Sequence, residues 1–398
     1  MTIIAHPHDL LLARDFPPIG GGIARWMEAF ALGSPAQSLT VSTGAVVGAD
    51  ASDARLLQPI DRVPVAIDRL RTIPGLAAWS RRIVALARDR PARVAWCDTI
   101  RPAGYAARWL HARTGTPYLI MVVGNDLMTL SAKLRRGTIK RPLIRSVLHR
   151  AAGFVAISEW TGEQCRTLLD ELGLDDAMAR VHVIPLGADP ARFQPDAGNV
   201  ATFRQRHGLP DGRWLVTVAR LVDYKGQDDA IRLLAGLAPD YPALHYAIVG
   251  RGPHETTLRD LAVTLGVADR VHLLTDVTDA ELPAAYSLAD VYLGLTRETA
   301  ADVEGFGLAL VEASACGVAV VATQTGGIGD AVADGVTGIR VPPDDSAATS
   351  LAVRALLEMP ERARQLGAAG RARVVNYLNW DRVVADMRAV AASVERVA

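Results

Sequence analysis

The sequence predicts an α/β protein built from two doubly wound, Rossmann-like domains that face a cleft. Three observations support this fold class. The chain has 398 residues, 50% of them hydrophobic, a length typical of two domains. Short apolar runs alternate with segments of helical periodicity, as in the βα units of parallel sheets. The net charge also changes sign: residues 1–198 carry 24 Lys and Arg against 18 acids, and residues 199–398 carry 19 against 25.

Composition excludes several other classes of protein. A charged fraction of 22% and the high apolar content exclude a disordered or fibrous chain. No apolar run reaches the roughly 18–20 residues that span a bilayer. Cys97, Cys165 and Cys316 form no Cys-x-x-Cys pair, so we expect neither a zinc site nor a disulfide framework. The N-terminus lacks a basic segment followed by a long apolar core, which indicates a cytosolic start rather than a signal peptide.

The N-terminal domain is expected to span residues 1–190. Its predicted strands are residues 2–6, 38–43, 93–97, 117–123 and 153–158. The segment after the first loop has the apolar spacing i, i+3, i+4, i+7 and i+8 of an amphipathic helix. The apolar residues of this helix are Ile23, Trp26, Met27, Phe30 and Ala31.

The C-terminal domain is expected to span residues 200–375, after a linker rich in Pro, Gly and Asp at 185–199. Its predicted strands are residues 214–219, 245–250, 270–274, 291–295 and 318–323. Residues 376–398 are predicted to form a terminal helix that packs back on the N-terminal domain. In doubly wound sheets, ligands bind at the carboxyl ends of the strands.

Three consecutive glycines, Gly20, Gly21 and Gly22, follow the first predicted strand and open the amphipathic helix. Glycine lets the backbone approach a ligand closely, and a helix N-terminus offers free N–H groups to an anion. Arg25 stands where a dinucleotide fingerprint needs its third glycine, so that motif is excluded. The alternative is a flexible turn without a ligand.

Arg220 and Lys225 lie in the loop that follows the strand at 214–219, just before a helix predicted to begin near Gln227. Two cations beside a helix N-terminus form a positive pocket suited to a diphosphate. Arginine can hold phosphate oxygens through two parallel bonds, whereas lysine supplies a compact charge. The alternative is an ordinary solvated loop.

The most specific motif contains Glu304 and Glu312, with Gly305, Phe306 and Gly307 between them. The glycines predict a loop around Glu304 and a helix that starts near Gly307. Eight helical residues rise about 12 Å, whereas the carboxylates of a glycosidase lie about 5–9.5 Å apart, so a glycosidase fits poorly. Glu312 interrupts a run that is otherwise apolar enough to be buried, which favours binding over two surface glutamates.

This pattern suits a ligand that carries hydroxyls on both sides of a diphosphate. The N–H groups of Gly307 and Leu308 would face the anion, and the two carboxylates would accept hydrogen bonds from hydroxyls. A nucleotide sugar has that arrangement.

Residues 133–150 contain seven Lys or Arg and no acid, interleaved with apolar residues. This pattern is typical of a segment that lies on an anionic membrane or binds an acidic acceptor. We assign this contact to Lys133, Arg135, Arg136, Lys140 and Arg141. The alternative is a solvated helix face, and nucleic acid is disfavoured because the segment has no aromatic residue for stacking.

Taken together, these motifs resemble the retaining glycosyltransferases of family four, which have the GT-B fold. The resemblance rests on the glycine-rich loop, the Arg and Lys after a strand, the turn at 250–253, the Glu-x7-Glu motif and the segments TGG and DGVTG. It covers nearly the whole chain and is strongest over 215–343. The segments FPPIGGG and DVEGFGLALVEASACG are most similar to the branch of phosphatidylinositol mannosyltransferases and polysaccharide hexosyltransferases.

The resemblance implies a hexosyltransferase, with mannose favoured, that uses a GDP- or UDP-sugar and a hydroxyl of a lipid-linked, polysaccharide or other glycan acceptor. Arg220 and Lys225 then bind the pyrophosphate, Glu304 the donor sugar and Glu312 the ribose. The remaining donor contacts it implies are Gly21, Gly22, Val277, Gly305, Phe306, Gly307 and Leu308. Arg220, Lys225 and Glu304 are the expected catalytic residues.

We expect no metal or other cofactor, because Arg220 and Lys225 supply the positive charge and no Asp-x-Asp motif lies at the donor site. The expected location is the cytoplasm, or the periphery of the inner face of the plasma membrane, and the expected role is cell-envelope glycan synthesis. One departure is Val123, where many members of the family carry a histidine that contacts the donor sugar; Asn125 or Asp126 are candidates for part of its role. The alternatives are a nucleotide-sugar epimerase or a phosphorylase of the same architecture, or an inactive nucleotide-binding homologue.

Overall fold

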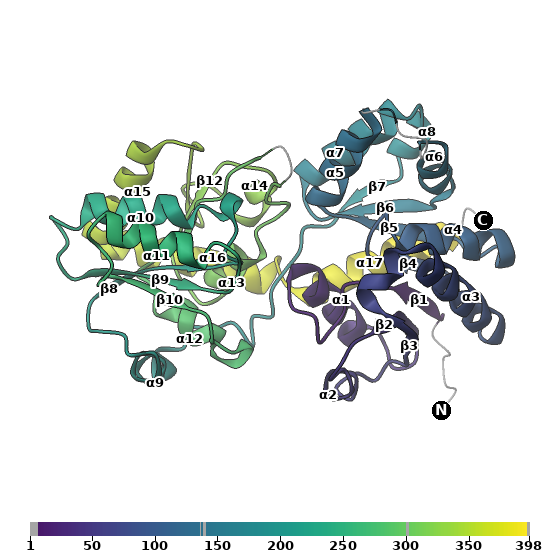
Figure 1. Ribbon diagram of the computed structural model, residues 1–398, viewed down its shortest axis with the longest axis horizontal. Helices are drawn as coiled ribbons and strands as arrows, with labels where there is room; N and C mark the ends of the chain where they lie inside the picture. The colour runs from purple at the N-terminus through teal and green to yellow at the C-terminus, as the bar shows by residue number, and fades with distance from the viewer. Residues whose placement is uncertain (1–6, 136, 138–140, 300–301, 396–398) are drawn as a thin grey trace. The chain divides into compact units, whose positions relative to one another are not determined.

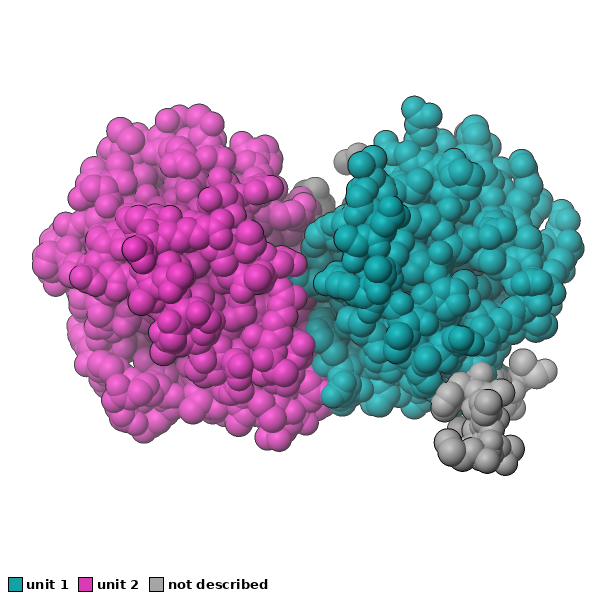
Figure 2. All heavy atoms as spheres, turned by 90° about the horizontal axis from the view of Figure 1, so that it is seen from below, with its two compact units in different colours: residues 1–186, 380–398 teal, residues 187–379 magenta. Residues whose placement is uncertain are grey.

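The computed structural model describes residues 7–135, 137, 141–299 and 302–395, apart from the side chains of residues 125, 133, 135 and 395. The chain forms two compact units (Figure 2). Unit 1 contains Met1–Leu186 and Trp380–Ala398, and unit 2 contains Gly187–Asn379. The boundary after Leu186 lies inside the segment predicted as a linker.

Unit 1 is built on a seven-stranded sheet in which every pairing is parallel, in the order β3-β2-β1-β4-β5-β6-β7 (Figure 1). Its strands are β1 Asp9–Leu12, β2 Leu39–Ala45, β3 Ile60–Ala66, β4 Ala95–Cys97, β5 Tyr118–Val122, β6 Gly153–Ala156 and β7 Val181–Val183. Its α-helices are α1 Gly22–Gly33, α2 Asp50–Asp53, α3 Ile73–Asp89, α4 Ala103–Thr114, α5 Gly124–Arg135, α6 Arg141–Arg150, α7 Glu159–Glu171, α8 Asp175–Met178 and α17 Trp380–Glu395.

Unit 2 is built on a six-stranded parallel sheet in the order β10-β9-β8-β11-β12-β13. Its strands are β8 Arg213–Val218, β9 Leu244–Val249, β10 Val271–Leu274, β11 Val291–Gly294, β12 Val320–Thr323 and β13 Ile339–Val341. Its α-helices are α9 Ala197–His207, α10 Gln227–Leu237, α11 Glu255–Thr264, α12 Leu282–Ser287, α13 Leu308–Ala315, α14 Ile328–Ala331, α15 Ser346–Glu358 and α16 Pro360–Asn376. The predicted fold class of two parallel α/β units is therefore confirmed.

The central strands β4 and β5 are apolar along their whole length because helices cover both faces of the sheet. In β4, Ala95 and Cys97 belong to the core beneath α3 and α4. The alternate residue, Trp96, packs edge-on against Phe30 of α1 on the other face, with ring centroids 5.2 Å apart. Successive side chains of a strand point to opposite faces, so one short apolar run supplies both cores.

The first predicted helix is confirmed as α1, in which Trp26, Met27, Phe30 and Ala31 are buried. Ile23 is half-buried. Helix α17 packs against α1 within unit 1, and the indole N–H of Trp26 lies 3.4 Å from the sulfur of Met387. Among the described residues, no helix is long and apolar enough to cross a membrane.

The predicted strands after the first are confirmed, with ends that differ by one or two residues. The prediction at 2–6 falls on residues outside the described ranges, and the first described strand is β1. Strands β1, β3, β7 and β13 were not predicted. Strand β1 is central, whereas β3, β7 and β13 are edge strands of their sheets. These edge strands are only partly buried. Strands β7 and β13 have three residues each, and the seven-residue β3 contains Asp61, Arg62 and Pro64, so none of the three has a continuous apolar run.

Candidate functional site

The candidate site of unit 2 lies where the strand order reverses, between β8 and β11. In a doubly wound sheet this switch point leaves room for a ligand at the carboxyl ends of the strands. A cavity of about 30 Å³ opens there, and Lys225, Glu304 and Gly307 line it together with residues at the ends of both strands. The structure therefore brings together residues that the sequence placed in two separate motifs.

Lys225 and Glu304 form an ion pair between Nζ and Oε2, although 79 residues separate them along the chain. Their side chains are only 15% and 18% exposed. Burial opposes the charge of Lys225, but the carboxylate of Glu304 and the neighbouring Tyr224 outweigh it and raise the pKa of the ammonium. The site thus holds a permanent cation and a carboxylate side by side, one able to meet a phosphate and the other a hydroxyl.

The loop that carries Lys225 is closed by backbone geometry. Gly226 has φ 67°, and a Cβ atom on it would lie 1.8 Å from the carbonyl oxygen of Leu295, so no other residue fits. The buried side chain of Gln227 donates a hydrogen bond of 2.9 Å to the carbonyl of Arg220. Helix α10 begins at Gln227, as predicted. Arg220 itself is exposed, and within the described part of the chain its guanidinium makes only a long contact of 3.5 Å with the Tyr224 hydroxyl.

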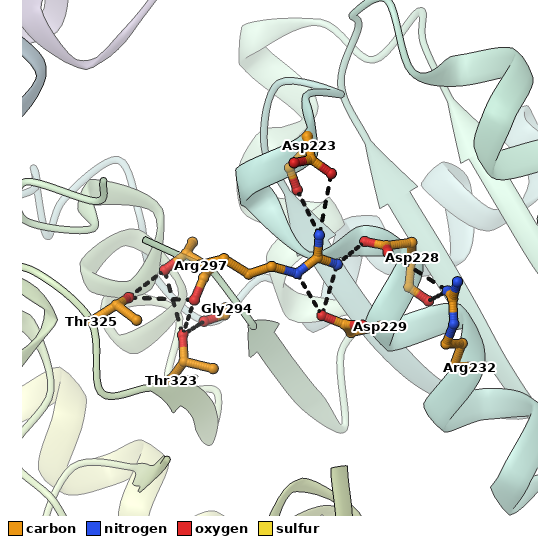
Figure 3. Close-up of polar contacts among 9 residues, drawn as sticks. Asp223, Asp228, Asp229, Arg232, Gly294, Arg297, Thr323 and Thr325 are labelled. Atoms are coloured by element: carbon orange, nitrogen blue, oxygen red, sulfur yellow. Dashed lines mark hydrogen bonds and ion pairs between the residues drawn. The ribbon is translucent and has the colours of Figure 1, made fainter. Parts of the chain in front are cut away.

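Arg297, which sequence reasoning missed, fastens the loop after β11 to the start of α10 (Figure 3). Its Nε donates to Asp229 at 2.9 Å, one terminal nitrogen lies 3.2 Å from a carboxylate oxygen of Asp223, and the other bonds to Asp228. Burial raises the pKa of the Asp229 carboxyl, and the hydrogen bond from Arg297 offsets this only in part.

The main chain adds a further link, because the N–H of Arg297 donates to the carbonyl of Tyr224 at 2.8 Å. Arg297 therefore holds the residue next to Lys225 in place. The sequence does show two adjacent acids, Asp228 and Asp229, at the start of a predicted helix. Spacing cannot show that their cationic partner is Arg297, which lies 68 residues after Asp229.

Glu304 lies in a loop that ends at Gly307, which has φ 91° and caps α13. The helix begins at Leu308, close to the predicted start. The carbonyl of Glu304 accepts a hydrogen bond of 2.8 Å from the N–H of Gly327, and a Cβ atom on Gly326 would lie 2.2 Å from that carbonyl. The segment TGG thus packs against the backbone of Glu304.

Glu312 lies inside α13 and is 2% exposed, as its apolar surroundings predicted. Its carboxylate accepts a hydrogen bond of 2.5 Å from the hydroxyl of Tyr286 in α12. A buried carboxylate needs such a partner. The partner that the structure shows is a protein hydroxyl, and sequence reasoning did not identify Tyr286.

The other predicted donor contacts are spread over both units. Val277 lies half-buried in the loop after β10, and Phe306 is buried beside Gly305. In unit 1, Gly21 is exposed with φ 126° and Gly22 is the first residue of α1. The assignment of these residues to ligand groups remains a prediction.

Most of the basic side chains predicted to contact a membrane or acceptor, within 133–141, lie outside the described part of the structure. Arg136 and Lys140 lie outside the described residues, as do the side chains of Lys133 and Arg135. Arg141 is exposed and donates to the carbonyl of Glu171 at 2.5 Å. Helix α6 buries three apolar residues and leaves its basic residues at the surface, so the described part is amphipathic.

The departure at Val123 lies at the end of β5, where this residue is 8% exposed. Asp126 lies in the first turn of α5 and lines a separate cavity within unit 1. Within the ranges that the structure describes, no three or more His, Cys, Asp and Glu side chains are grouped to hold a metal ion.

Comparison with known proteins matches two sequence families. Residues 199–373 match the family described as Glycosyl transferases group 1, and residues 20–192 match Glycosyltransferase Family 4. The chain is 33% identical over 379 residues to a GDP-mannose-dependent alpha-(1-6)-phosphatidylinositol monomannoside mannosyltransferase of Mycolicibacterium smegmatis, covering 93% of this chain and 94% of the relative. It is 35% identical over 241 residues to a D-inositol 3-phosphate glycosyltransferase of Salinispora tropica, covering 57% and 48%.

The fold also matches solved structures. The crystal structure of Anabaena Alr3699/HepE in complex with UDP and glucose superposes with a TM-score of 0.80 at 18% identity, over 98% of this chain and 100% of that chain. At this identity the match concerns the fold alone.

Proposed function

The chain belongs to glycosyltransferase family 4, and from this premise we propose that it transfers a hexose, with mannose favoured, from a GDP- or UDP-sugar to a hydroxyl of a lipid-linked, polysaccharide or other glycan acceptor. The family resemblance predicted from the motifs is confirmed, as is the prediction of an enzyme that transfers sugars. The curated relatives are transferases, so an epimerase, a phosphorylase and an inactive homologue are not favoured.

The observation that carries the proposal is the ion pair of Lys225 and Glu304 at the switch point of the unit 2 sheet. In the proposed reaction, the bond between the donor's anomeric carbon and its phosphate oxygen breaks, and the electron pair stays on the leaving diphosphate. The acceptor oxygen attacks the same face of the sugar, and its proton passes to the leaving phosphate. The product therefore retains the configuration of the donor.

The charge on the diphosphate grows as the bond breaks, so a cation that neutralises it acts most strongly in the transition state. Lys225 is the fixed cation of the site, and the exposed Arg220 is free to turn toward a ligand. Glu304, next to Lys225, would accept a hydrogen bond from a hydroxyl of the donor sugar. This arrangement needs no metal ion, because the two side chains supply the positive charge.

The remaining assignments complete the donor site. Glu312, fixed by Tyr286, would hold the ribose, and the backbone of Val277 would meet the nucleobase. Gly21 and Gly22 would contact the phosphates from unit 1. The relative of Mycolicibacterium smegmatis is GDP-mannose-dependent, which makes GDP-mannose the first donor to test.

The acceptor proposal extends to location. The basic residues at 133–150 support peripheral contact with the inner face of the plasma membrane and a role in cell-envelope glycan synthesis. Co-sedimentation with anionic but not neutral vesicles is the expected result, and equal binding to both would contradict it.

The direct test of the proposed function is a transfer assay with GDP-mannose and UDP-glucose, using phosphatidylinositol and a soluble hexoside as acceptors. The expected product is a glycosylated acceptor whose anomeric configuration, read by proton NMR, matches that of the donor. An isomerised donor, a sugar phosphate formed only with added phosphate, or an inverted product would overturn the proposal.

A further inference from the structure

Unit 1 contains a cavity of about 890 Å³, separate from the candidate site of unit 2. It lies among helices α3, α4, α5 and α6, and the turn at 100–102 lines it as well. Its volume is within the range of about 300–1,000 Å³ that is usual for ligand pockets. All of the lining residues belong to unit 1, so the cavity is complete within that unit.

The apolar part of the lining is unusual because much of it faces solvent. Ile73, Trp109 and Leu143 line the cavity and are 86%, 45% and 52% exposed. They come from three different helices, α3, α4 and α6, and Leu76 and Ala77 extend the same surface along α3. Large apolar side chains gathered around one opening mark a surface that a ligand or membrane covers.

The polar part of the lining is strongly cationic. Arg71, Arg81, Arg101 and Arg108 line the cavity, and the lining contains one carboxylate. Within the described ranges, Arg71, Arg81 and Arg101 form no ion pair with a carboxylate. Three unpaired guanidinium groups at the edge of an apolar cavity complement an anionic group joined to an apolar body.

The single carboxylate, Asp126, lies near Arg71 and Arg101. Its Oδ2 atom is buried and has no hydrogen-bond partner among the residues that the structure describes. Burial raises the pKa of this carboxyl, and the nearby arginines lower it in part. A buried polar atom without a partner is destabilising, and a ligand hydroxyl would satisfy it.

We propose that this cavity holds a hydrocarbon chain of an anionic lipid acceptor, with the anionic group at the end formed by Arg71 and Arg101. The inference rests on the proposed glycosyl transfer and adds the class of acceptor and the place of its chain. A bare glycan fits poorly, because it would leave Ile73, Leu76 and Leu143 against hydroxyl groups.

The test measures lipid binding without any donor, by titrating the protein with lysophosphatidylglycerol below its critical micelle concentration. The palmitoyl lipid should bind much more tightly than the hexanoyl lipid, because each buried methylene contributes about fourfold in affinity. Ala77→Phe fills the cavity and should weaken palmitoyl binding at least tenfold while leaving hexanoyl binding and the melting temperature unchanged.

The matched control is Ala85→Phe, an exposed position on α3 outside the cavity lining, which should bind both lipids like the wild type. Equal binding of palmitoyl lysophosphatidylcholine, whose headgroup is zwitterionic, would overturn the anionic class. Unchanged palmitoyl binding by Ala77→Phe would overturn the cavity as the site of the chain.

The outcome is separable from that of the proposed function. Lipid binding that depends on Ala77, in a protein that transfers no sugar, would support the cavity and contradict the transferase proposal. Equally efficient transfer to short-chain and long-chain acceptors would support the transferase and contradict the cavity.

Discussion

The two units differ in how they position the side chains that are candidates for binding a ligand. In unit 2, the cation Lys225 is mostly buried and paired with Glu304. Its loop is held in place by the tight packing of Gly226 and by the hydrogen bond from Arg297 to Tyr224. In unit 1, a cavity of about 890 Å³ is lined by unpaired arginines and exposed apolar side chains. A fixed charged site suits a ligand of constant structure such as a diphosphate, whereas an open apolar cavity tolerates a ligand of variable shape.

The largest effect is expected from removing the buried cation Lys225 from the candidate site of unit 2. Lys225→Ala should lower kcat by about 10²–10³, as the loss of one charge-stabilising donor does in other enzymes, while the circular dichroism spectrum stays unchanged. Single-turnover assays with GDP-mannose measure this. Arg232→Ala, which removes a surface cation of the same unit, should retain activity, and near-normal turnover of Lys225→Ala would contradict its assigned role.

A smaller effect tests how unit 2 keeps Lys225 in place. Arg297→Gln should lower kcat about tenfold, because the Tyr224–Lys225 loop loses its anchor, and Arg297→Lys should restore part of it. The variant also leaves three carboxylates without their shared cation, so the Tm should fall by about 2–4 °C for each kcal/mol lost.

The matched control for Arg297 is Arg232→Gln, because Arg232 also contacts Asp228 but lies on the exposed side of α10. If Arg297→Gln lowered the Tm while kcat and the donor KM stayed at wild-type values, Arg297 would be only structural.

The hydrogen bond between Tyr286 and the buried carboxylate of Glu312 gives the next test of the unit 2 site. Tyr286→Phe removes a hydrogen bond to the carboxylate of Glu312 and should cost about 2 kcal/mol of unfolding free energy. If Glu312 holds the ribose, the donor KM should rise severalfold with kcat little changed. Tyr246→Phe removes another buried hydroxyl contact of unit 2 and should leave the donor KM unchanged. An equal rise of the donor KM in both variants would show that the rise comes from general destabilisation of unit 2 and not from Glu312.

The smallest effect belongs to the open cavity. Arg101→Gln should raise the KM for an anionic lipid acceptor about threefold at low salt and flatten its dependence on ionic strength, because a partly solvent-exposed charge contributes little and is screened. The donor KM should not change. Arg88→Gln, at an exposed position in the last turn of α3, serves as control. If Arg101→Gln lowered kcat as much as Lys225→Ala, the proposed difference between a fixed charged site in unit 2 and an open binding cavity in unit 1 would be wrong.

The sequence predicted the turns around the candidate site of unit 2 because short segments specify them. Gly226, Gly307 and Gly326 have positive φ values and lie against backbone or side-chain atoms, so the chain signals these turns by residue type. The long-range pairs were not visible: Lys225 with Glu304, Arg297 with Asp229 and Glu312 with Tyr286 each depend on how the strands order in the sheet.

The sequence singled out Asp126 and the segment 133–150, but it gave no sign that they line one cavity in unit 1. Its lining comes from α3, α4, α5 and α6, with Ile73, Trp109 and Leu143 at ordinary helix positions. Such residues are typical of a helix face packed in a core, and only the arrangement of the helices leaves them around an open space. The edge strands β3, β7 and β13 escaped prediction for a related reason, because their partial burial leaves no apolar run.

The central claim is that unit 2 binds a nucleotide sugar through Lys225. Its most direct measurement is the Tm of the wild type and of Lys225→Ala with increasing GDP-mannose, GDP and UDP-glucose. We predict that one nucleotide series raises the wild-type Tm by about 5–10 °C at a hundredfold excess over Kd, and that Lys225→Ala loses most of this rise. No shift with any of these ligands, or the same shift in both proteins, would contradict the claim.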